Sequence, residues 1–119
     1  MHIEMTKDTR SYQLRFSVKD EKEEIGWGFL VIVYNDRHEE PYGIMENVYV
    51  LPDHRKKGAG KALVSQIIAK AKELRCYKLL GQSRYGRDAV HHFYIRQGFT
   101  DHGKNFRMDL LESKTQQPD

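Results

Sequence analysis

Hydrophobic and polar residues alternate in the first half of the chain, and this pattern predicts β-strands. Tyr12–Lys19 alternates strictly, with its apolar residues on one face, as a half-buried strand does. Ile25–Tyr34 is apolar on both faces, which is typical of a strand that is covered on both sides. Tyr42–Leu51 follows a polar turn and should end before Pro52, because proline has no N–H to donate to a sheet. We expect these three strands to form an antiparallel meander.

A helical pattern follows the third predicted strand. Apolar positions recur at helical spacing from about Ala59 to Arg75, which predicts an amphipathic helix. Its apolar face carries Leu63, Val64, Ile67, Ile68, Ala71 and Leu74. Tyr77–Ser83 is another apolar strand. Because a crossover helix precedes it, we expect it to lie parallel to Tyr42–Leu51.

The rest of the pattern predicts a second helix and a hairpin. Asp88 suits the N-cap of a short helix, and Gly98 suits the residue just past its end. Phe99–His102 and Phe106–Leu111 should pair as a final hairpin. Together these elements predict an α+β fold with a mixed, mostly antiparallel sheet and two main helices.

The composition fits one compact domain. The 119 residues suffice for one core, and we place a single domain over residues 1–111 and a disordered polar tail over residues 112–119. No apolar run is long enough to span a membrane, and the polar first ten residues do not resemble a signal peptide. Cys76 is the only cysteine, so no internal disulfide can form, and we expect a cytoplasmic protein. The net charge of +3 suits an anionic ligand, but it is also common without one.

A basic turn joins the third strand to the first helix. Its cations and glycines are Arg55, Lys56, Lys57, Gly58, Gly60 and Lys61. N–H groups at a helix start have no intrahelical partner and the helix dipole is positive there, so this turn suits a phosphate. Spacing excludes two familiar loops, because Arg55 stands where a Walker A loop needs glycine and Leu63 where a dinucleotide-binding loop does. A solvated basic turn without a ligand is the alternative.

Two segments resemble motifs of the GNAT superfamily of N-acetyltransferases. Arg55–Gly60 matches the acyl-CoA loop of that family, which reads Arg or Gln, two residues, Gly, one residue, and Gly or Ala. Val50 and Pro52 stand where the family usually has Val and Pro. Ala89–Phe99 resembles a later segment with alanine, an aromatic-Tyr pair and Gly-Phe. Both motifs occur in the right order, and the resemblance covers roughly Ile25–Phe99.

The resemblance implies a GNAT-like splayed sheet and an N-acetyltransferase that uses acetyl-CoA as co-substrate. Acetyl-CoA would lie between Tyr42–Leu51 and Tyr77–Ser83, where amides around Tyr49–Leu51 would polarise the thioester carbonyl. The expected contacts are Val48, Tyr49, Val50, Arg55, Lys56, Lys57, Gly58, Ala59, Gly60 and Lys61. Tyr94 matches the general acid that protonates the departing thiolate, with a core aromatic as the alternative. Arg87 stands where the family often has Asn and is a candidate for binding a CoA phosphate.

Acetyl transfer to an amine also needs a base, because a lysine-type amine with a pKa of about 10.4 arrives protonated. Glu46 is the candidate: we expect it to share an apolar strand face with Val48 and Val50, where burial would raise its pKa. An ion pair between Glu46 and a nearby Lys or Arg is the alternative.

Other polar and aromatic residues receive weaker roles. The remaining candidate bases are His54, His91 and His92. The last two are adjacent on a helix and therefore diverge, so we expect two surface histidines and no metal site. Cys76 is expected to be a small apolar residue rather than a nucleophile, and Trp27 a core residue.

One departure from the family concerns the first eleven residues. Met1–Ser11 is too short for the strand and two helices that usually precede the meander. We therefore expect an acceptor side that is open or completed by another chain, for example in a homodimer. A non-catalytic acetyl-CoA-binding module that regulates a partner protein is the alternative function. A nucleic-acid binder is a weaker alternative, because most aromatic residues fall on core faces. The acceptor amine is left open.

Overall fold

The computed structural model describes residues 1–111. Contacts within the chain divide it into two compact units, one from Met1 to Gly81 and one that begins at Gln82. The single domain over residues 1–111 stays a prediction, and the predicted tail, 112–119, lies outside the described residues. No helix within residues 1–111 has both the length and the apolar character that a membrane span requires.

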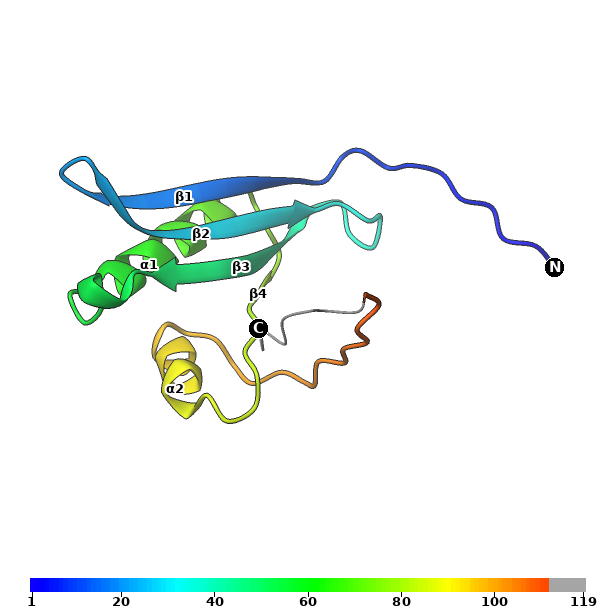
Figure 1. Cartoon of the computed structure of the whole chain (residues 1–119). Helices are drawn as coiled ribbons and strands as arrows, with labels where there is room; N and C mark the ends of the chain where they lie inside the picture. Colours follow the sequence, from blue (N-terminus) through cyan, green and yellow to red (C-terminus); the bar gives the residue numbers. More distant parts are fainter. Residues whose placement is uncertain (112–119) are drawn as a thin grey trace. The chain divides into compact units, whose positions relative to one another are not determined.

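The first unit is built on a four-stranded sheet (Figure 1). The elements of the chain are β1 (Tyr12–Asp20), β2 (Glu23–Val33), β3 (Tyr42–Val50), the 3-10 helix η1 (Pro52–His54), α1 (Ala59–Glu73), β4 (Leu79–Leu80) and α2 (Asp88–Arg96). β1 pairs antiparallel with β2, and β2 with β3, which confirms the predicted meander. β4 pairs parallel with β3 as predicted, but it has two residues rather than the predicted Tyr77–Ser83. The sheet is therefore mixed and mostly antiparallel.

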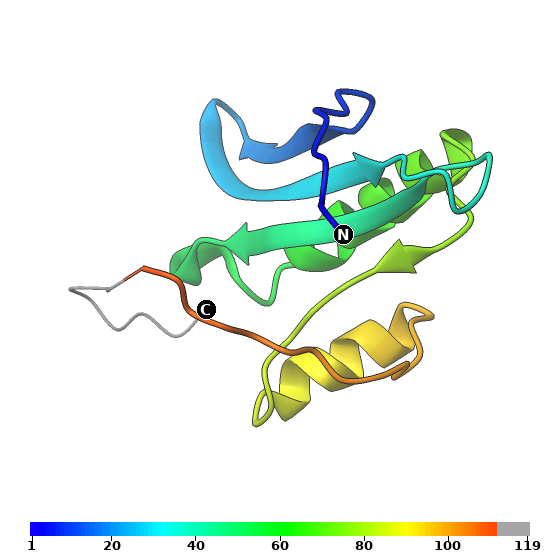
Figure 2. The same ribbon diagram turned by 90° about the vertical axis from the view of Figure 1, so that its right-hand side faces the viewer.

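The core lies between α1 and one face of the sheet, where the helix contacts β1, β2 and β3 (Figures 1 and 2). The buried apolar side chains are Ile25, Leu30, Ile32, Met45, Leu63, Val64, Ile67 and Ala71. Full burial of a side chain such as Leu30 stabilises the fold by about 1.5–3 kcal/mol. A Cβ added at Gly28 would lie 3.2 Å from Cδ1 of Ile67. The glycine therefore lets the helix pack closely against β2.

The opposite face of β2 is less buried than the sequence predicts. Trp27, Phe29, Val31 and Val33 are half-buried, whereas Leu30 on the helix face is fully buried. The alternation of the two faces is confirmed, but the face away from α1 is only partly covered, whereas the sequence predicts a strand covered on both sides. An apolar pattern on both faces shows that either face could be buried, but it does not show what covers the second face.

A bulge at Asn47 reverses the faces of the residues that follow it in β3. The β2–β3 register shifts at this point, because β3 has one residue more than β2, and Asn47 has a left-handed φ of 48°. Glu46 lies opposite Phe29 on the face away from α1. Val48 faces the helix side of the sheet: its Cγ2 lies 3.3 Å from the position that a Cβ would take at Gly28, close to Ile67 of α1. The prediction that Glu46 shares a face with Val48 and Val50 is therefore wrong.

The second unit contains α2 (Figure 2). Arg87 occupies the N-cap position without a side-chain capping bond in the described residues, and Asp88 is the first helical residue. The predicted N-cap role of Asp88 is therefore wrong. The predicted helix end is confirmed, because Gly98 has a φ of 104° and the Phe99 N–H donates to the Tyr94 carbonyl at 3.1 Å, as in a Schellman motif.

The predicted hairpin over Phe99–His102 and Phe106–Leu111 is wrong, since residues 99–111 contain no strand. Phe106, Met108, Leu110 and Leu111 are exposed. A two-stranded hairpin alone is marginally stable in water and needs a further strand or a helix to cover its apolar face. The alternation in this segment predicts an extended conformation but cannot supply that partner.

Candidate functional site

The turn between β3 and α1, which we call the basic loop (residues 55–61), leads directly into the helix. α1 begins at Ala59 with Gly58 as its N-cap residue. Gly58 has a φ of 86°, in the left-handed region where other residues are strained. Lys56 also has a positive φ, 65°, which the sequence does not reveal because lysine has no preference for that conformation. These two residues turn the chain into the helix.

The basic loop presents an anion-binding end of α1. The first helical bond is donated by the Ala62 N–H to the Gly58 carbonyl at 3.0 Å, so the preceding N–H groups have no intrahelical acceptor. Within the described residues no side chain caps this end, and the first turn of the helix has no acidic residue. The exposed cations around it are Arg55, Lys56, Lys57 and Lys61. Amides, helix dipole and cations all favour a bound anion here.

β3 and β4 separate after a short stretch of pairing. Within residues 1–111 they pair at Gly43–Leu79 and Ile44–Leu80, and β3 continues to Val50 whereas β4 ends. Within the described residues, the edge of β3 beyond Ile44 on that side has no strand partner. The short pairing agrees with the splayed sheet that the family resemblance implies.

Of the amides expected around Tyr49–Leu51, one is directed to that uncovered edge. The Leu51 N–H donates to the Ile25 carbonyl on β2 at 2.8 Å, so it is not available to a ligand. Because successive residues of a strand direct their amides to opposite sides, Tyr49 faces β2 and Val50 faces away from it. The Val50 carbonyl accepts a hydrogen bond from Nε of Arg55 at 2.8 Å. Of these three amides, the Val50 N–H is therefore the one that faces away from β2.

An aromatic pair and two arginines lie on the sheet face opposite α1. Trp27 and Tyr49 are cross-strand partners, with ring centroids 5.2 Å apart and planes at 29°. The Arg55 guanidinium carbon lies 5.1 Å from the Tyr49 ring centroid, and that of Arg15 lies 5.8 Å from the Trp27 ring. Trp27 is thus half-buried in a surface stack rather than in the core as predicted.

The candidate base Glu46 is exposed on the same face as Tyr49, so the burial on which its role depended is absent. His54 lies just before the basic loop, and its side chain is 19% exposed. Its Nε2 is 3.9 Å from a carboxylate oxygen of Glu23, and its Nδ1 is buried without a hydrogen-bond partner in the described part of the chain. His54 is therefore better shielded from water than Glu46, and both stay candidates.

The candidates in the second unit lie on or beside α2. The ring of Tyr94 is half-buried, 6.0 Å from the Phe93 ring and 5.4 Å from the Phe99 ring. Its role as general acid stays a prediction, as does phosphate binding by the exposed Arg87.

The two adjacent histidines of α2 differ in their surroundings. His91 is half-buried, with Nε2 2.8 Å from the Arg84 carbonyl, so the prediction that it is a surface residue is wrong. His92 is exposed as predicted. A sequence pattern could not show this difference, because the contact comes from the turn before the helix.

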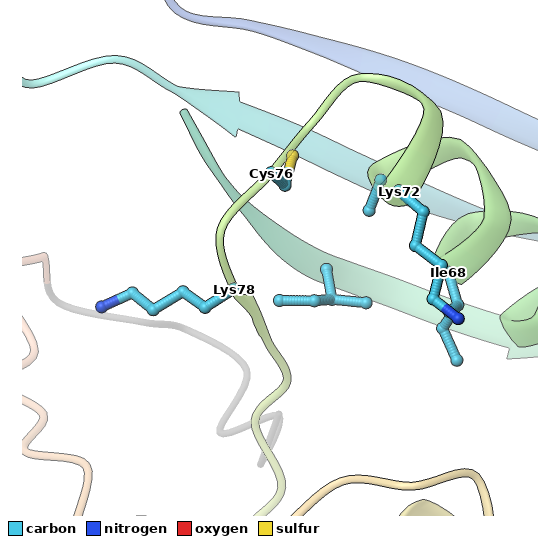
Figure 3. Close-up of a pocket in the computed structure, with 6 residues that line it drawn as sticks. Ile68, Lys72, Cys76 and Lys78 are labelled. Carbon is cyan, nitrogen blue, oxygen red and sulfur yellow. The ribbon is translucent and has the colours of Figure 1, made fainter. Parts of the chain in front are cut away.

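Two open hollows are lined by residues outside the basic loop. One, of about 200 Å³, is lined by Ile68, Ala71, Lys72, Cys76, Lys78 and Leu79 (Figure 3). The other, of about 280 Å³, lies between β1 and α1. Burial raises the pKa of the Cys76 thiol, which favours its unreactive form and agrees with the expectation that Cys76 is no nucleophile.

Comparison with known proteins connects this geometry to one family. The sequence model of the Acetyltransferase (GNAT) family matches residues 2–99. The structure resembles an acetyltransferase of Trypanosoma brucei, with 28% identity and a TM-score of 0.71 over 84% of this chain and 69% of the other. It also resembles a protein of Agrobacterium tumefaciens str. C58 whose description assigns it to the acetyltransferases, with 29% identity and a TM-score of 0.78 over 82% of this chain and 69% of the other.

A third solved structure shares the fold at lower identity. It is an aminoglycoside N-acetyltransferase, AAC(6')-Iy, in complex with CoA, with 17% identity and a TM-score of 0.68 over 82% of this chain and 75% of the other. No curated protein matches the sequence.

Proposed function

Since the chain belongs to the GNAT acetyltransferase family, we propose that it transfers the acetyl group of acetyl-CoA to a primary amine by direct transfer in a ternary complex. The observation that carries this proposal is the uncapped, cation-flanked helix start in the basic loop, next to the uncovered edge of β3. The loop offers N–H donors and cations to a pyrophosphate, and the edge offers backbone groups to the extended pantetheine arm of acetyl-CoA.

In the proposal, the basic loop holds the pyrophosphate of CoA. Backbone N–H groups of residues 56–61 donate to the phosphate oxygens, and the positive end of the helix dipole adds to their attraction. Lys56, Lys57 and Lys61 are exposed and supply charge around the anion. Support also comes from the CoA complex of AAC(6')-Iy, which has the same fold.

The Val50 N–H polarises the thioester carbonyl in this mechanism. It is fixed in a strand and directed away from β2, so it needs no reorganisation when negative charge develops on the carbonyl oxygen. The amine nitrogen attacks the carbonyl carbon, the C–S bond breaks, and CoA departs as a thiolate that takes up a proton.

Two proton transfers remain for side chains. The amine must lose a proton before or during attack, and Glu46 and His54, directly or through water, are our candidate bases, with the two histidines of α2 as alternatives. Tyr94 is the candidate acid for the CoA thiolate. Arg87 is a candidate ligand of a CoA phosphate.

The test mixes the protein with acetyl-CoA and, in turn, small amines, lysine peptides and peptides with free N-termini, and measures the release of free CoA thiol. We expect acetyl-CoA to bind and at least one amine class to give enzyme-dependent thiol release and an acetylated product by mass spectrometry. Binding without release across the whole panel would contradict the proposal and indicate a non-catalytic acetyl-CoA-binding module. Absence of binding would contradict both functions.

A further inference from the structure

We propose that Trp27 is a positioning residue for the basic loop and that it acts through Tyr49 and Arg55, an inference that rests on the proposed function. Trp27 lies in the middle of β2, far in sequence from the loop and outside both family motifs. Its contacts nevertheless form a continuous path from the sheet to the first residue of the loop.

The path consists of two ring contacts. Trp27 stacks on Tyr49 with ring centroids 5.2 Å apart. The Arg55 guanidinium carbon in turn lies 5.1 Å from the centroid of the Tyr49 ring. Tyr49 is 39% exposed, so neither contact is buried deeply enough to count as core packing. Aromatic pairs and cation–π contacts are directional, so each fixes the position of the next group.

Arg55 then fixes the start of the loop. Its Nε donates to the Val50 carbonyl at 2.8 Å, which ties the loop to the end of β3. The next residue, Lys56, holds a left-handed φ of 65°, a conformation that lysine adopts only when its surroundings impose it. In the proposal, the contacts of Arg55 with the Tyr49 ring and with the Val50 carbonyl hold Lys56 in this conformation. Loop amides are aimed correctly only while this geometry holds.

A different role for Arg55 would give different results. If its guanidinium bound phosphate directly and did not rest on Tyr49, CoA affinity would depend on Arg55 but not on Trp27. If the stack positions the loop, loss of Trp27, Tyr49 or Arg55 should weaken CoA binding, and the losses should not add.

β2 offers a matched control for Trp27. Phe29 is on the same strand and the same face, and its ring also lies 5.8 Å from the Arg15 guanidinium. Its partner on β3 is Glu46 rather than Tyr49. Phe29→Leu therefore removes a half-buried aromatic ring and a cation–π contact from this face without touching the path to Arg55.

The test measures CoA binding to the full chain by isothermal titration calorimetry. We expect Trp27→Leu to weaken binding roughly three- to tenfold, the range for loss of one aromatic contact, and Phe29→Leu to change it less than twofold. Trp27→Phe should restore most of the affinity. Adding Tyr49→Leu to Trp27→Leu should weaken binding little further. Tyr49→Leu alone, at an exposed position, tests the same path if Trp27→Leu does not fold.

A second readout separates positioning from stability. S-acetylpantetheine lacks the pyrophosphate that the loop would hold, so Trp27→Leu should lower kcat/KM with acetyl-CoA but not with S-acetylpantetheine. Equal losses with both donors, or equal effects of Trp27→Leu and Phe29→Leu on CoA affinity, would overturn the inference while the wild-type chain still binds CoA. Failure of the wild-type chain to bind CoA would instead overturn the proposed function.

Discussion

The substitution Gly58→Ala tests the geometry of the basic loop. Gly58 is the N-cap residue of α1 and has a φ of 86°. An added Cβ would meet no atom within 4 Å, so the substitution introduces no steric clash with the rest of the protein. Its effect is therefore confined to the backbone, because alanine is strained in the left-handed region whereas glycine is not.

The expected cost of Gly58→Ala is about 1–2 kcal/mol, the cost of one alanine in a left-handed conformation. This cost can appear in two places. If the loop keeps its conformation, the free energy of unfolding falls by that amount, and Tm falls by about 4 °C or more per kcal/mol. If the loop relaxes instead, it must return to the strained form to bind CoA, and the affinity falls by roughly 5- to 30-fold. The two losses together should amount to about 1–2 kcal/mol.

Gly60→Ala is the matched control, because Gly60 lies two residues after Gly58, inside the first turn of α1. Gly60 has no left-handed φ, and an added Cβ would lie 3.9 Å from Cγ2 of Val50, an ordinary contact. Alanine should therefore stabilise the helix by roughly 0.5–1 kcal/mol. The family loop also accepts alanine here, so CoA binding should persist. Gly58→Asn should fall between wild type and Gly58→Ala, because asparagine tolerates positive φ better.

The assay combines thermal unfolding by circular dichroism with calorimetric CoA titration of the same samples. The expected order of Tm is Gly60→Ala, wild type, Gly58→Asn, Gly58→Ala, from highest to lowest, if the loop stays rigid. Our account of the loop would be refuted if Gly58→Ala matched wild type in both Tm and CoA affinity. A loss of CoA affinity in Gly60→Ala equal to that in Gly58→Ala would refute the distinction between the two glycines.

Three further predictions concern other parts of the chain. Tyr94→Phe should lower kcat by about a hundredfold or more with little change in acetyl-CoA affinity, because a general acid typically contributes that much; an unchanged kcat in steady-state assays would exclude Tyr94 as the acid. A guanidinium nitrogen of Arg15 lies 2.7 Å from a carboxylate oxygen of Glu24 and lowers the pKa of Glu24 below its ordinary value of 4.5. Ionised Glu24 therefore stabilises the fold above about pH 4.5, and this contribution is lost as the pH falls through the folded-state pKa. Glu24→Gln should therefore lower Tm at neutral pH and have little effect in strong acid, and a pH-independent difference would contradict this. Burial raises the pKa of Cys76 above 9.0, so at pH 9 iodoacetamide should alkylate the folded chain more slowly than the urea-unfolded chain, as followed by mass spectrometry.

The meander and α1 could be predicted from the sequence because their signals are local. Strict alternation in Tyr12–Lys19 and helical spacing from Leu63 to Ala71 each determine which side chains face the core. The position of the basic loop follows equally directly from Pro52 and the two glycines. These features depend on residues that are close in sequence, so no knowledge of distant contacts is needed.

Other features depend on distant contacts or on a single irregular residue. The half-buried state of Trp27 follows from what covers the sheet, and the missing hairpin over residues 99–111 follows from the absence of a covering partner in the described structure. Leu51 has an amide like its neighbours, and only its bond to Ile25 shows that it is occupied. None of these facts leaves a pattern in the sequence that differs from the alternative.

The bulge at Asn47 links the sheet to the proposed site. If Asn47 continued the regular alternation of β3 instead of forming a bulge, Tyr49 would face α1 and Trp27 would have no stacking partner. With the bulge, Tyr49 reaches the face that bears Trp27, and its ring can support Arg55. The same shift places the Val50 side chain against the helix while its amide faces the uncovered edge. The bulge at Asn47 therefore places both groups that our proposals assign to acetyl-CoA binding, the Val50 amide and the aromatic support of Arg55. It also explains why face assignments past Glu46 fail when strict alternation is assumed.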